Sequence, residues 1–217
     1  GERSVIAPGA RLEKLAGDFL FTEGPAVDRT GNIYFTDQPN DRILIWSGRG
    51  ELIPFLQPSG RANGLCFDKK GNLWVCADDK NELWVIGPDK EVRVIIKDYQ
   101  GKLLNGPNDL WMTPKGGLYL TDPLYPREYW VRGQQSQMEG DWVYYLPDGG
   151  KVLQPVITDL RQPNGIIGTP DGKRLYVSDL GDKKTYRYQI APNGSLTGKE
   201  LFCDMGSDGM TVDSEGN

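Results

Sequence analysis

The sequence predicts an all-β protein with the repeated hairpins of a β-propeller, and two observations support this fold class. The stretch EGPAVDRTGNIYFTD at residues 23–37 returns in altered form at Asn63, Asn108, Asn164 and Asp208. The five copies start 40, 45, 56 and 44 residues apart, a period that indicates a propeller or a solenoid array. In addition, no stretch shows a sustained helical period, whereas apolar, β-branched and aromatic residues gather in short runs.

Each copy predicts four strands. An apolar run of about five residues is followed by a short polar turn and a second apolar run, which is the pattern of a β-hairpin. Two further strand-like runs follow each hairpin: 42–46 and 51–55, 82–86 and 91–96, 142–146 and 151–157, 184–190 and 200–203. Four antiparallel strands in about 40 to 45 residues make one propeller blade.

The copies follow one another without a Pro/Ser-rich linker, so we expect a single domain over residues 1–217. Its blades should begin near residues 23, 63, 108, 164 and 208. The run 11–15 is expected to form a strand that helps to close the ring. The last copy stops at the turn that precedes the second strand in earlier copies. The sequence therefore predicts about four and a half blades, an incomplete ring at the C-terminal end.

Composition excludes several classes of function. The chain has no histidine, which rules out Ser-His-Asp and Cys-His hydrolases, His-ligated zinc enzymes and a histidine base. A formal net charge of −5 without a basic stripe argues against a nucleic-acid partner. No apolar run approaches the roughly 18 residues of a membrane helix. The first residue is Gly, which leaves the compartment open between a bacterial-type cytoplasm and a periplasm, and the oligomeric state is also open.

The repeat starts place oxygen-bearing side chains at equivalent positions. The first strand of a blade is innermost, so the side chains that begin the copies should surround one mouth of the central channel: Glu23, Asn63, Asn108, Asn164 and Asp208. A glycine follows four of them, which keeps the backbone small where strands converge. The alternative is that Asn-Gly and Asp-Gly are only turn dipeptides. It is less favoured because each hairpin has its turn elsewhere and one start is a glutamate.

This ring predicts a divalent cation. Two carboxylates and several amides on one axis would be costly to bring together without a positive charge among them. Because every donor is oxygen, Ca²⁺ is expected first, Mg²⁺ or Mn²⁺ next, and Zn²⁺ less readily. The protein would supply about three or four ligands, fewer than the six to eight that Ca²⁺ takes. Positions open to water or substrate are typical of a catalytic metal.

The chain resembles the SMP-30/gluconolactonase family of six-bladed propellers over nearly its whole length. The resemblance lies in EGP at Glu23, in PNDL around Asn108 with LYLTDP after it, in PNG at Asn164 and in DGM at Asp208. It implies a metal held by Glu23, Asn164 and Asp208, with Asn108 at the metal or at the substrate. It also implies that Asp208 is the general base. Gly106 stands where animal members carry an arginine, so the bacterial gluconolactonase branch is the nearer likeness.

Three functions stay open. The first is a lactone hydrolase, in which the cation polarises the lactone carbonyl and Asp208 takes a proton from the attacking water. The second is an organophosphate hydrolase with the same ligands, as in the related squid-type phosphotriesterases. The third is a non-enzymatic propeller that binds a partner, which would not need Glu23 and Asp208 aligned at the channel mouth.

The longest period carries an insertion at residues 123–140, between the expected second and third strands. This loop should rise on the same face as the ring. Its aromatic and basic residues are therefore expected to wall a pocket: Tyr125, Arg127, Tyr129, Trp130 and Arg132. Asn63 and Asn108 are expected to contact substrate together with Tyr125, Arg127 and Trp130. The alternative is a surface loop whose aromatic residues pack on neighbouring blades.

Other recurring residues point to structural roles. Asp37, Asp122 and Asp179 end the second strands and are expected to cap local turns. The aromatic residues inside those strands are expected to pack between blades: Tyr34, Trp74, Tyr119 and Tyr176. The three cysteines lack the spacing of a zinc or redox site and are expected to be buried apolar fillers: Cys66, Cys76 and Cys203.

Overall fold

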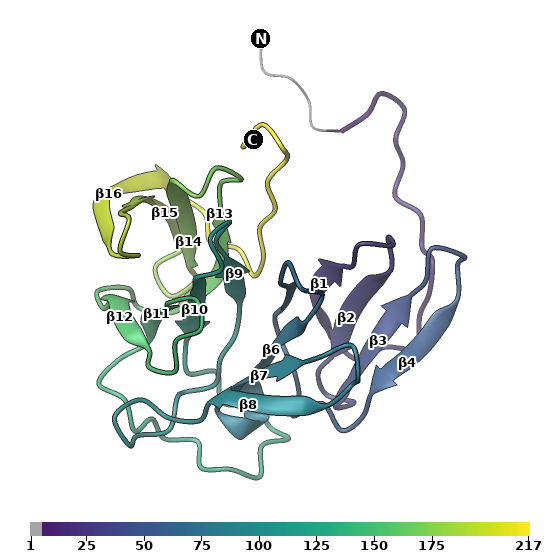
Figure 1. Ribbon diagram of the computed structural model, residues 1–217, viewed down its shortest axis with the longest axis horizontal. Coiled ribbons are helices and arrows are strands. Elements are labelled where there is room, and N and C mark those ends of the chain that lie inside the picture. The colour runs from purple at the N-terminus through teal and green to yellow at the C-terminus, as the bar shows by residue number, and fades with distance from the viewer. Residues whose placement is uncertain (1–5) are drawn as a thin grey trace.

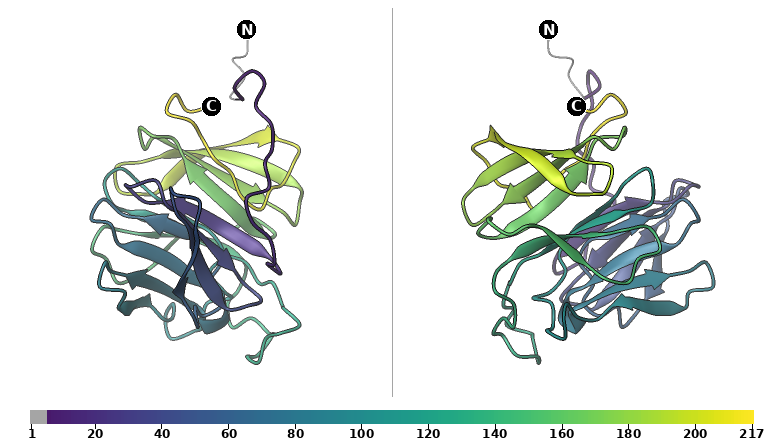
Figure 2. Two further views of the ribbon diagram at one scale, coloured as in Figure 1. Left: turned by 90° about the vertical axis from the view of Figure 1, so that its right-hand side faces the viewer. Right: turned by 60° about the vertical axis from the view of Figure 1, so that its left-hand side comes forward.

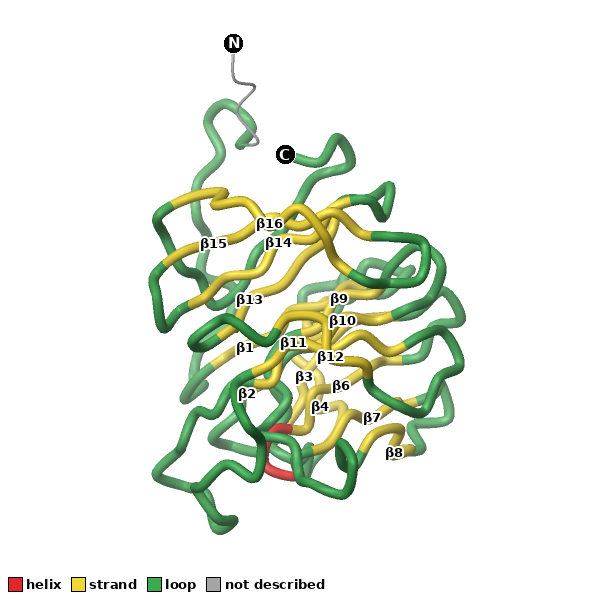
Figure 3. Tube along the Cα trace, turned by 90° about the vertical axis from the view of Figure 1, so that its left-hand side faces the viewer, coloured by secondary structure: helices red, strands yellow, loops and turns green. Residues whose placement is uncertain are grey.

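The computed structural model describes residues 6–217, and these residues form four antiparallel sheets of four strands each (Figure 1). In each sheet the strands lie in chain order. The strands are β1 (Thr22–Val27), β2 (Ile33–Asp37), β3 (Arg42–Trp46), β4 (Leu52–Leu56), β5 (Leu65–Phe67), β6 (Leu73–Ala77), β7 (Glu82–Ile86), β8 (Val92–Ile96), β9 (Leu110–Met112), β10 (Leu118–Asp122), β11 (Trp142–Leu146), β12 (Gln154–Ile157), β13 (Pro163–Gly168), β14 (Arg174–Asp179), β15 (Lys184–Ile190) and β16 (Leu196–Cys203). The described chain contains one helical element, the short 3₁₀ helix η1 (Asp78–Lys80), drawn red in Figure 3.

The four sheets are successive blades of a propeller. Their first strands meet one another, since β1 touches β5, β5 touches β9, and β9 touches β13. The later strands of each sheet extend outward from these inner strands, as the views in Figure 2 show. The prediction of an all-β propeller is confirmed, with four complete blades in the described chain.

Local turn chemistry repeats with the blades. Asp28, Asp68 and Asp213 each accept hydrogen bonds at Oδ1 from the amides two and four residues later, at 2.8 to 2.9 Å. A glycine three residues after each aspartate has a φ of 84° to 86°, in the left-handed region that glycine enters without a Cβ clash. The fifth copy therefore forms the same turn as the first two, although none of its residues lies in a strand.

The apolar core lies between neighbouring blades. One cluster joins the first and second sheets and includes Ile43 and Val75. A second cluster joins the second and third sheets, and a third joins the third and fourth. Tyr34 makes edge contacts with Phe55 and with Phe67 of the next blade, at centroid distances of 5.1 and 4.9 Å. Each blade therefore buries its faces against its neighbours, which orients the inner strands toward a shared axis.

The other predicted interblade aromatic residues behave less uniformly. The hydroxyl of buried Tyr119 donates to the carbonyl of Gly194 in the fourth blade (2.6 Å). Trp74 packs beside the cluster between the second and third sheets. Tyr176 instead contacts Phe202 within its own blade, at a centroid distance of 4.9 Å. No sheet follows the fourth one within residues 6–217, so this contact does not test the interblade prediction for Tyr176.

Two expectations fail. Residues 11–15 form no strand and are largely exposed, because a strand needs a partner edge and no described segment pairs with this run. Cys76 is fully buried, but Cys66 and Cys203 are only partly buried, and β16, which carries Cys203, presents mostly exposed side chains. No helix in residues 6–217 is long and apolar enough to cross a membrane.

Candidate functional site

The starts of the five copies lie side by side around the channel. Three of the glycines that follow them leave no room for a Cβ, because the backbone of the next copy lies against each one. The distances from an ideal Cβ are 2.3 Å for Gly24 to the carbonyl oxygen of Asn63, 2.7 Å for Gly64 to that of Asn108, and 3.0 Å for Gly165 to that of Asp208. The prediction that these glycines permit close approach is confirmed. At Gly209 no atom lies within 4 Å.

Bulges direct two of the candidate ligands. The pairing of β1 with β2 changes register between Glu23 and Ala26, and that of β13 with β14 changes register between Pro163 and Ile166. Glu23 and Asn164 therefore lie at equivalent irregularities of the innermost strands. A β-bulge breaks the alternation of side chains and can aim one of them along the channel.

Aspartates at the ends of the second strands hold the segments that lead into these positions. Each of these aspartates accepts hydrogen bonds from the backbone N–H groups of two consecutive residues. The second residue of each pair lies two positions before a copy start. The pairs are Asp37 with Leu20 and Phe21, Asp122 with Asn105 and Gly106, and Asp179 with Arg161 and Gln162. The predicted structural role is correct, but the main partners lie 16 to 18 residues earlier rather than in a local turn.

Asp122 leads to a stability prediction. Burial raises its pKa to about 7, against the lowering effect of its two backbone hydrogen bonds. Because the folded pKa exceeds the unfolded value of about 4, this group favours folding below pH 4 and loses that contribution as the pH rises through 7. We expect the Tm of the metal-free protein to fall on the order of 5 °C between pH 5 and pH 8.

Thermal unfolding followed by circular dichroism across this pH range checks the prediction. Asp122→Asn should flatten the decline, whereas the surface substitution Asp89→Asn should retain the wild-type slope. An Asp122→Asn slope equal to that of the wild type would show that Asp122 does not cause the decline.

Three of the predicted metal ligands converge. The amide Nδ2 of Asn164 lies 3.4 Å from Oδ1 of Asp208 and 3.4 Å from the hydroxyl of Tyr125. Burial raises the pKa of Glu23 to about 7, and the charge of Asp208 raises it further, against a lowering effect of Arg127. Asp208 comes from the C-terminal segment, drawn yellow in Figure 1, which runs back toward the inner strands.

This donor set suits a hard cation. Partly buried Glu23 faces the negative charge of Asp208, and a positive ion between them would remove the repulsion. A half turn of the Asn164 amide would present Oδ1 in place of Nδ2. Within residues 6–217 no three His, Cys, Asp or Glu side chains are grouped to hold a metal. A metal held here would therefore need amide oxygens as well as carboxylates.

The other two ring residues lie in the same channel. A cavity of about 540 Å³ is lined by Glu23, Asn63, Asn108 and Asp208, among others. Asn63 and Asn108 are 3% and 6% exposed, and Nδ2 of Asn63 is buried without a hydrogen-bond partner. A buried amide donor without an acceptor suits contact with a bound molecule.

One buried carboxylate at this place, Asp109, is absent from the site residues expected from the sequence. Asp109 follows Asn108, where the other copies have glycine, and it lines the same cavity. Its Oδ2 accepts the N–H of Ile166 at 3.1 Å, so it links the third blade to β13 just after Asn164. Burial raises the pKa of Asp109 to about 7, and the charge of Glu23 raises it further. The sequence did hold a signal for Asp109: it stands directly after the one copy start that is not followed by glycine.

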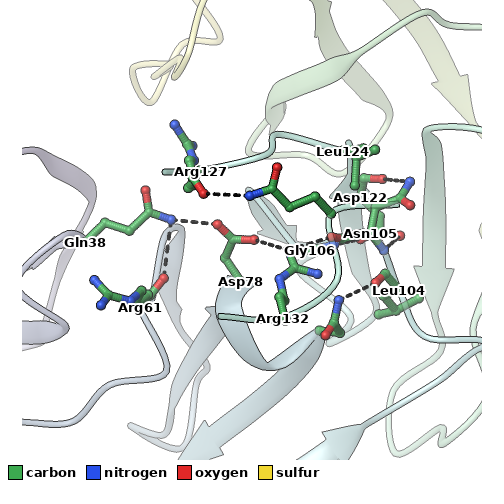
Figure 4. Close-up of polar contacts among 12 residues, drawn as sticks. Gln38, Arg61, Asp78, Leu104, Asn105, Gly106, Asp122, Leu124, Arg127 and Arg132 are labelled. Atoms are coloured by element: carbon green, nitrogen blue, oxygen red, sulfur yellow. Dashed lines mark hydrogen bonds and ion pairs between the residues drawn. The ribbon is translucent and has the colours of Figure 1, made fainter. Parts of the chain in front are cut away.

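The insertion at 123–140 is anchored by Arg132. Its Nη2 pairs with Oδ1 of Asp78 (3.1 Å) and donates to the backbone oxygen of Asn105 (2.8 Å). Asp78 also accepts from Nε2 of Gln38 (2.8 Å), so this cluster joins three blades (Figure 4). The guanidinium carbon of Arg132 lies 3.5 Å from the ring centroid of Trp130, which is 7% exposed. These contacts match the packing alternative for this part of the loop.

The same cluster explains the glycine at position 106. A Cβ there would lie 2.1 Å from Oδ1 of Asp78 and 2.7 Å from Nη2 of Arg132, and the φ of Gly106 is +144°. No side chain fits without displacing the ion pair. The space in front of position 106 is filled by an arginine from the insertion.

The first half of the insertion lies nearer the candidate ligands. Tyr125 reaches Asn164 through its hydroxyl, and the guanidinium carbon of Arg127 lies 5.4 Å from the Tyr125 ring centroid. Tyr129 carries the guanidinium of Arg61 over its ring at 4.2 Å. The structure thus places Tyr125 and Arg127 beside the candidate ligands, while Trp130 and Arg132 pack into the blades.

Comparison with known proteins places these features in a family. The gluconolactonase of Zymomonas mobilis is 30% identical over 242 residues, which span 99% of this chain and 68% of that protein. The diisopropyl-fluorophosphatase of Loligo vulgaris is 26% identical over 243 residues, spanning 100% of this chain and 76% of that protein. A solved gluconolactonase structure from Xanthomonas campestris matches with a TM-score of 0.87 at 27% identity, covering 93% of this chain and 70% of that one.

The family description that matches is the SMP-30/Gluconolactonase/LRE-like region, and the match extends over residues 21–217. It includes all five copy starts and the insertion. The chain therefore belongs to the SMP-30/gluconolactonase/LRE-like family.

Proposed function

We propose that this protein is a divalent-metal-dependent hydrolase that opens a sugar lactone. The observation that carries the proposal is the approach of Glu23, Asn164 and Asp208 from three separate inner segments to one place. The similarity to gluconolactonases supports the same reaction class.

Glu23, Asn164 and Asp208 would hold the cation, with Asn108 beside it. Ca²⁺ suits these oxygen donors best, followed by Mg²⁺ or Mn²⁺, with Zn²⁺ least favoured. When bound, such an ion supplies Lewis-acid polarisation of the lactone carbonyl. Asn63 and Asn108 would contact the substrate from the channel, and Tyr125 and Arg127 from the insertion, whereas Trp130 packs into the blades and is not proposed to contact it.

The residues of the chain account for the proton transfers. Asp208 accepts a proton from a water molecule as that water attacks the carbonyl carbon. The ring carbon–oxygen bond then breaks, and the proton returns from Asp208 to the departing oxygen, so that a hydroxy acid is formed. Glu23 and Asn164 keep their positions throughout because the bulges of β1 and β13 fix them. No step requires histidine, in agreement with the composition.

Removal and return of metal test the proposal. We expect chelation to lower hydrolysis of gluconolactone by at least about a hundredfold and excess Ca²⁺ to restore it, as acid release in a pH-stat would show. Saturation at about 100 times the Kd should also stabilise the fold by about 2.7 kcal/mol, which raises the Tm by several degrees. Hydrolysis that persists in chelator would contradict the metal-dependent reaction.

An organophosphate hydrolase with the same ligands is the second candidate, favoured by the match to the Loligo enzyme along the whole chain. Hydrolysis of diisopropyl fluorophosphate, measured beside gluconolactone, would separate the two. A Tm increase with Ca²⁺ and no turnover of either compound would favour a non-enzymatic binding propeller.

We also propose that the four blades belong to one six-bladed propeller domain. The chain spans 68% of the Zymomonas relative and 76% of the Loligo relative. The resemblance of its motifs to the six-bladed SMP-30/gluconolactonase propellers supports this ring size.

A further inference from the structure

We infer that Arg127 selects lactones carrying a permanent anionic group, a phosphate or a carboxylate, at the end remote from the reacting carbonyl. This inference rests on the proposed lactone hydrolase and names the substrate class of that site.

Arg127 differs from the other arginines near this mouth because its guanidinium has no hydrogen-bond or ion-pair partner among residues 6–217. The others are occupied: Arg42 by Asp37 (2.8 Å), Arg61 by the carbonyl of Pro39 (2.6 Å), Arg132 by Asp78 (3.1 Å) and Arg161 by Asp182 (4.0 Å). Nε is buried and unpaired in both Arg127 and Arg132, but Arg132 has partners for Nη2 and Arg127 has none for any guanidinium nitrogen among residues 6–217. An unpaired buried donor is unfavourable, and a ligand that supplies an acceptor removes the cost.

The position of Arg127 says which part of a substrate it can reach. Its guanidinium carbon lies 5.4 Å from the ring centroid of Tyr125, whose hydroxyl lies 3.4 Å from Nδ2 of Asn164. The ring of Tyr125 therefore separates the guanidinium of Arg127 from the candidate metal ligands. Arg127 also lowers the pKa of Glu23 by its charge without forming an ion pair with it. A group bound by Arg127 would lie several bonds from a carbonyl held between Glu23 and Asp208.

The chemistry of the pocket favours an anion as that group. A divalent cation would balance the charges of Glu23 and Asp208 and leave Arg127 without an anionic neighbour in contact. In Figure 4 the Arg127 side chain points away from the cluster of Gln38, Asp78 and Arg132, so that cluster does not satisfy it. A guanidinium offers paired donors that match the oxygens of phosphate and carboxylate.

The test compares three lactones in the Ca²⁺-loaded protein: neutral gluconolactone, its phosphate ester at the far carbon, and glucarolactone, which keeps a free carboxylate. We expect the wild type to prefer at least one anionic lactone by about tenfold or more in kcat/KM. Arg127→Gln should remove most of this preference, chiefly through KM, and Arg127→Lys should restore part of it. Arg49→Gln, at an exposed turn on the opposite face, should retain the wild-type preference.

Comparison of the two anionic lactones shows whether phosphate or carboxylate is the preferred group. If the wild type has the same kcat/KM for neutral gluconolactone as for both anionic lactones, the inference is overturned and the proposed function stands. An equal decrease in kcat/KM for all three lactones in Arg127→Gln would also overturn the inference, since Arg127 would then affect only the shape of the site.

If no lactone is hydrolysed, the proposed function fails, and calorimetry still decides the inference. Phosphogluconate should bind the Ca²⁺-loaded protein about tenfold more tightly than gluconate, and Arg127→Gln should remove the difference. Equal binding of the two acids by the wild type would overturn the inference.

Discussion

Asp208→Asn should lower lactone turnover by about a hundredfold to ten-thousandfold, and excess metal should not restore it. The substitution keeps an oxygen ligand but removes both a negative charge and the proton acceptor beside the attacking water. Initial rates on gluconolactone over a range of Ca²⁺ concentrations give the effect on turnover and on metal affinity separately. Asp204→Asn, at an exposed position four residues earlier, is the matched control and should behave as wild type.

Glu23→Gln also removes one negative charge from the candidate site, but it should act mainly through metal affinity. Glu23 lies in the bulge of β1, where it would serve as a ligand and not as the base. Its variant should therefore recover much of its activity in excess Ca²⁺ or Mg²⁺. Full recovery of Asp208→Asn at saturating metal would instead show that Asp208 is only a ligand and that the base lies elsewhere.

Arg132→Met should destabilise the fold by about 3 to 5 kcal/mol, because it leaves Asp78 as a buried charge without its cation. The two side chains are 14% and 6% exposed. Burial raises the pKa of Asp78 to about 6, and the charge of Arg132 opposes this rise. Urea unfolding followed by tryptophan fluorescence measures the change in the free energy of unfolding.

An exposed ion pair provides the control for this prediction. Arg161 and Asp182 lie 4.0 Å apart with side chains 73% and 38% exposed. Arg161→Met should cost no more than about 1 kcal/mol. The double variant Arg132→Met with Asp78→Asn should be more stable than Arg132→Met alone, since no buried charge remains. Equal costs for Arg132→Met and Arg161→Met would refute the anchoring role of Arg132.

The inner ring shows what repeat spacing can predict. The copies at Glu23, Asn63, Asn108 and Asn164 specify equivalent places in equivalent blades, so their convergence follows from the fold once the blade is recognised. The glycines that follow Glu23, Asn63 and Asn164 agree with this prediction, because the next inner strand leaves no space for a Cβ. At the third copy start the glycine is replaced by Asp109. Its role could be recognised only from the hydrogen bond that it accepts from the N–H of Ile166 in the next blade.

The insertion shows where sequence alone could not decide. Arg127 and Arg132 are the same residue type, five positions apart in one loop, and both were expected at the pocket wall. The structure pairs Arg132 with Asp78 and leaves Arg127 beside Tyr125. Asp78 lies 54 residues before Arg132, so no local pattern could assign this partner.

The sequence by itself determined the hairpin turns of the first, second and fifth copies, because each of these depends only on an aspartate, a glycine and backbone amides within four residues. The turn at Asp213 forms in the fifth copy without a strand beside it. Only the tertiary structure decided where residues 11–15 lie and which partners Asp37, Asp122 and Asp179 choose. A strand requires a partner edge, and a buried carboxylate takes whichever donors the packing of distant segments brings to it.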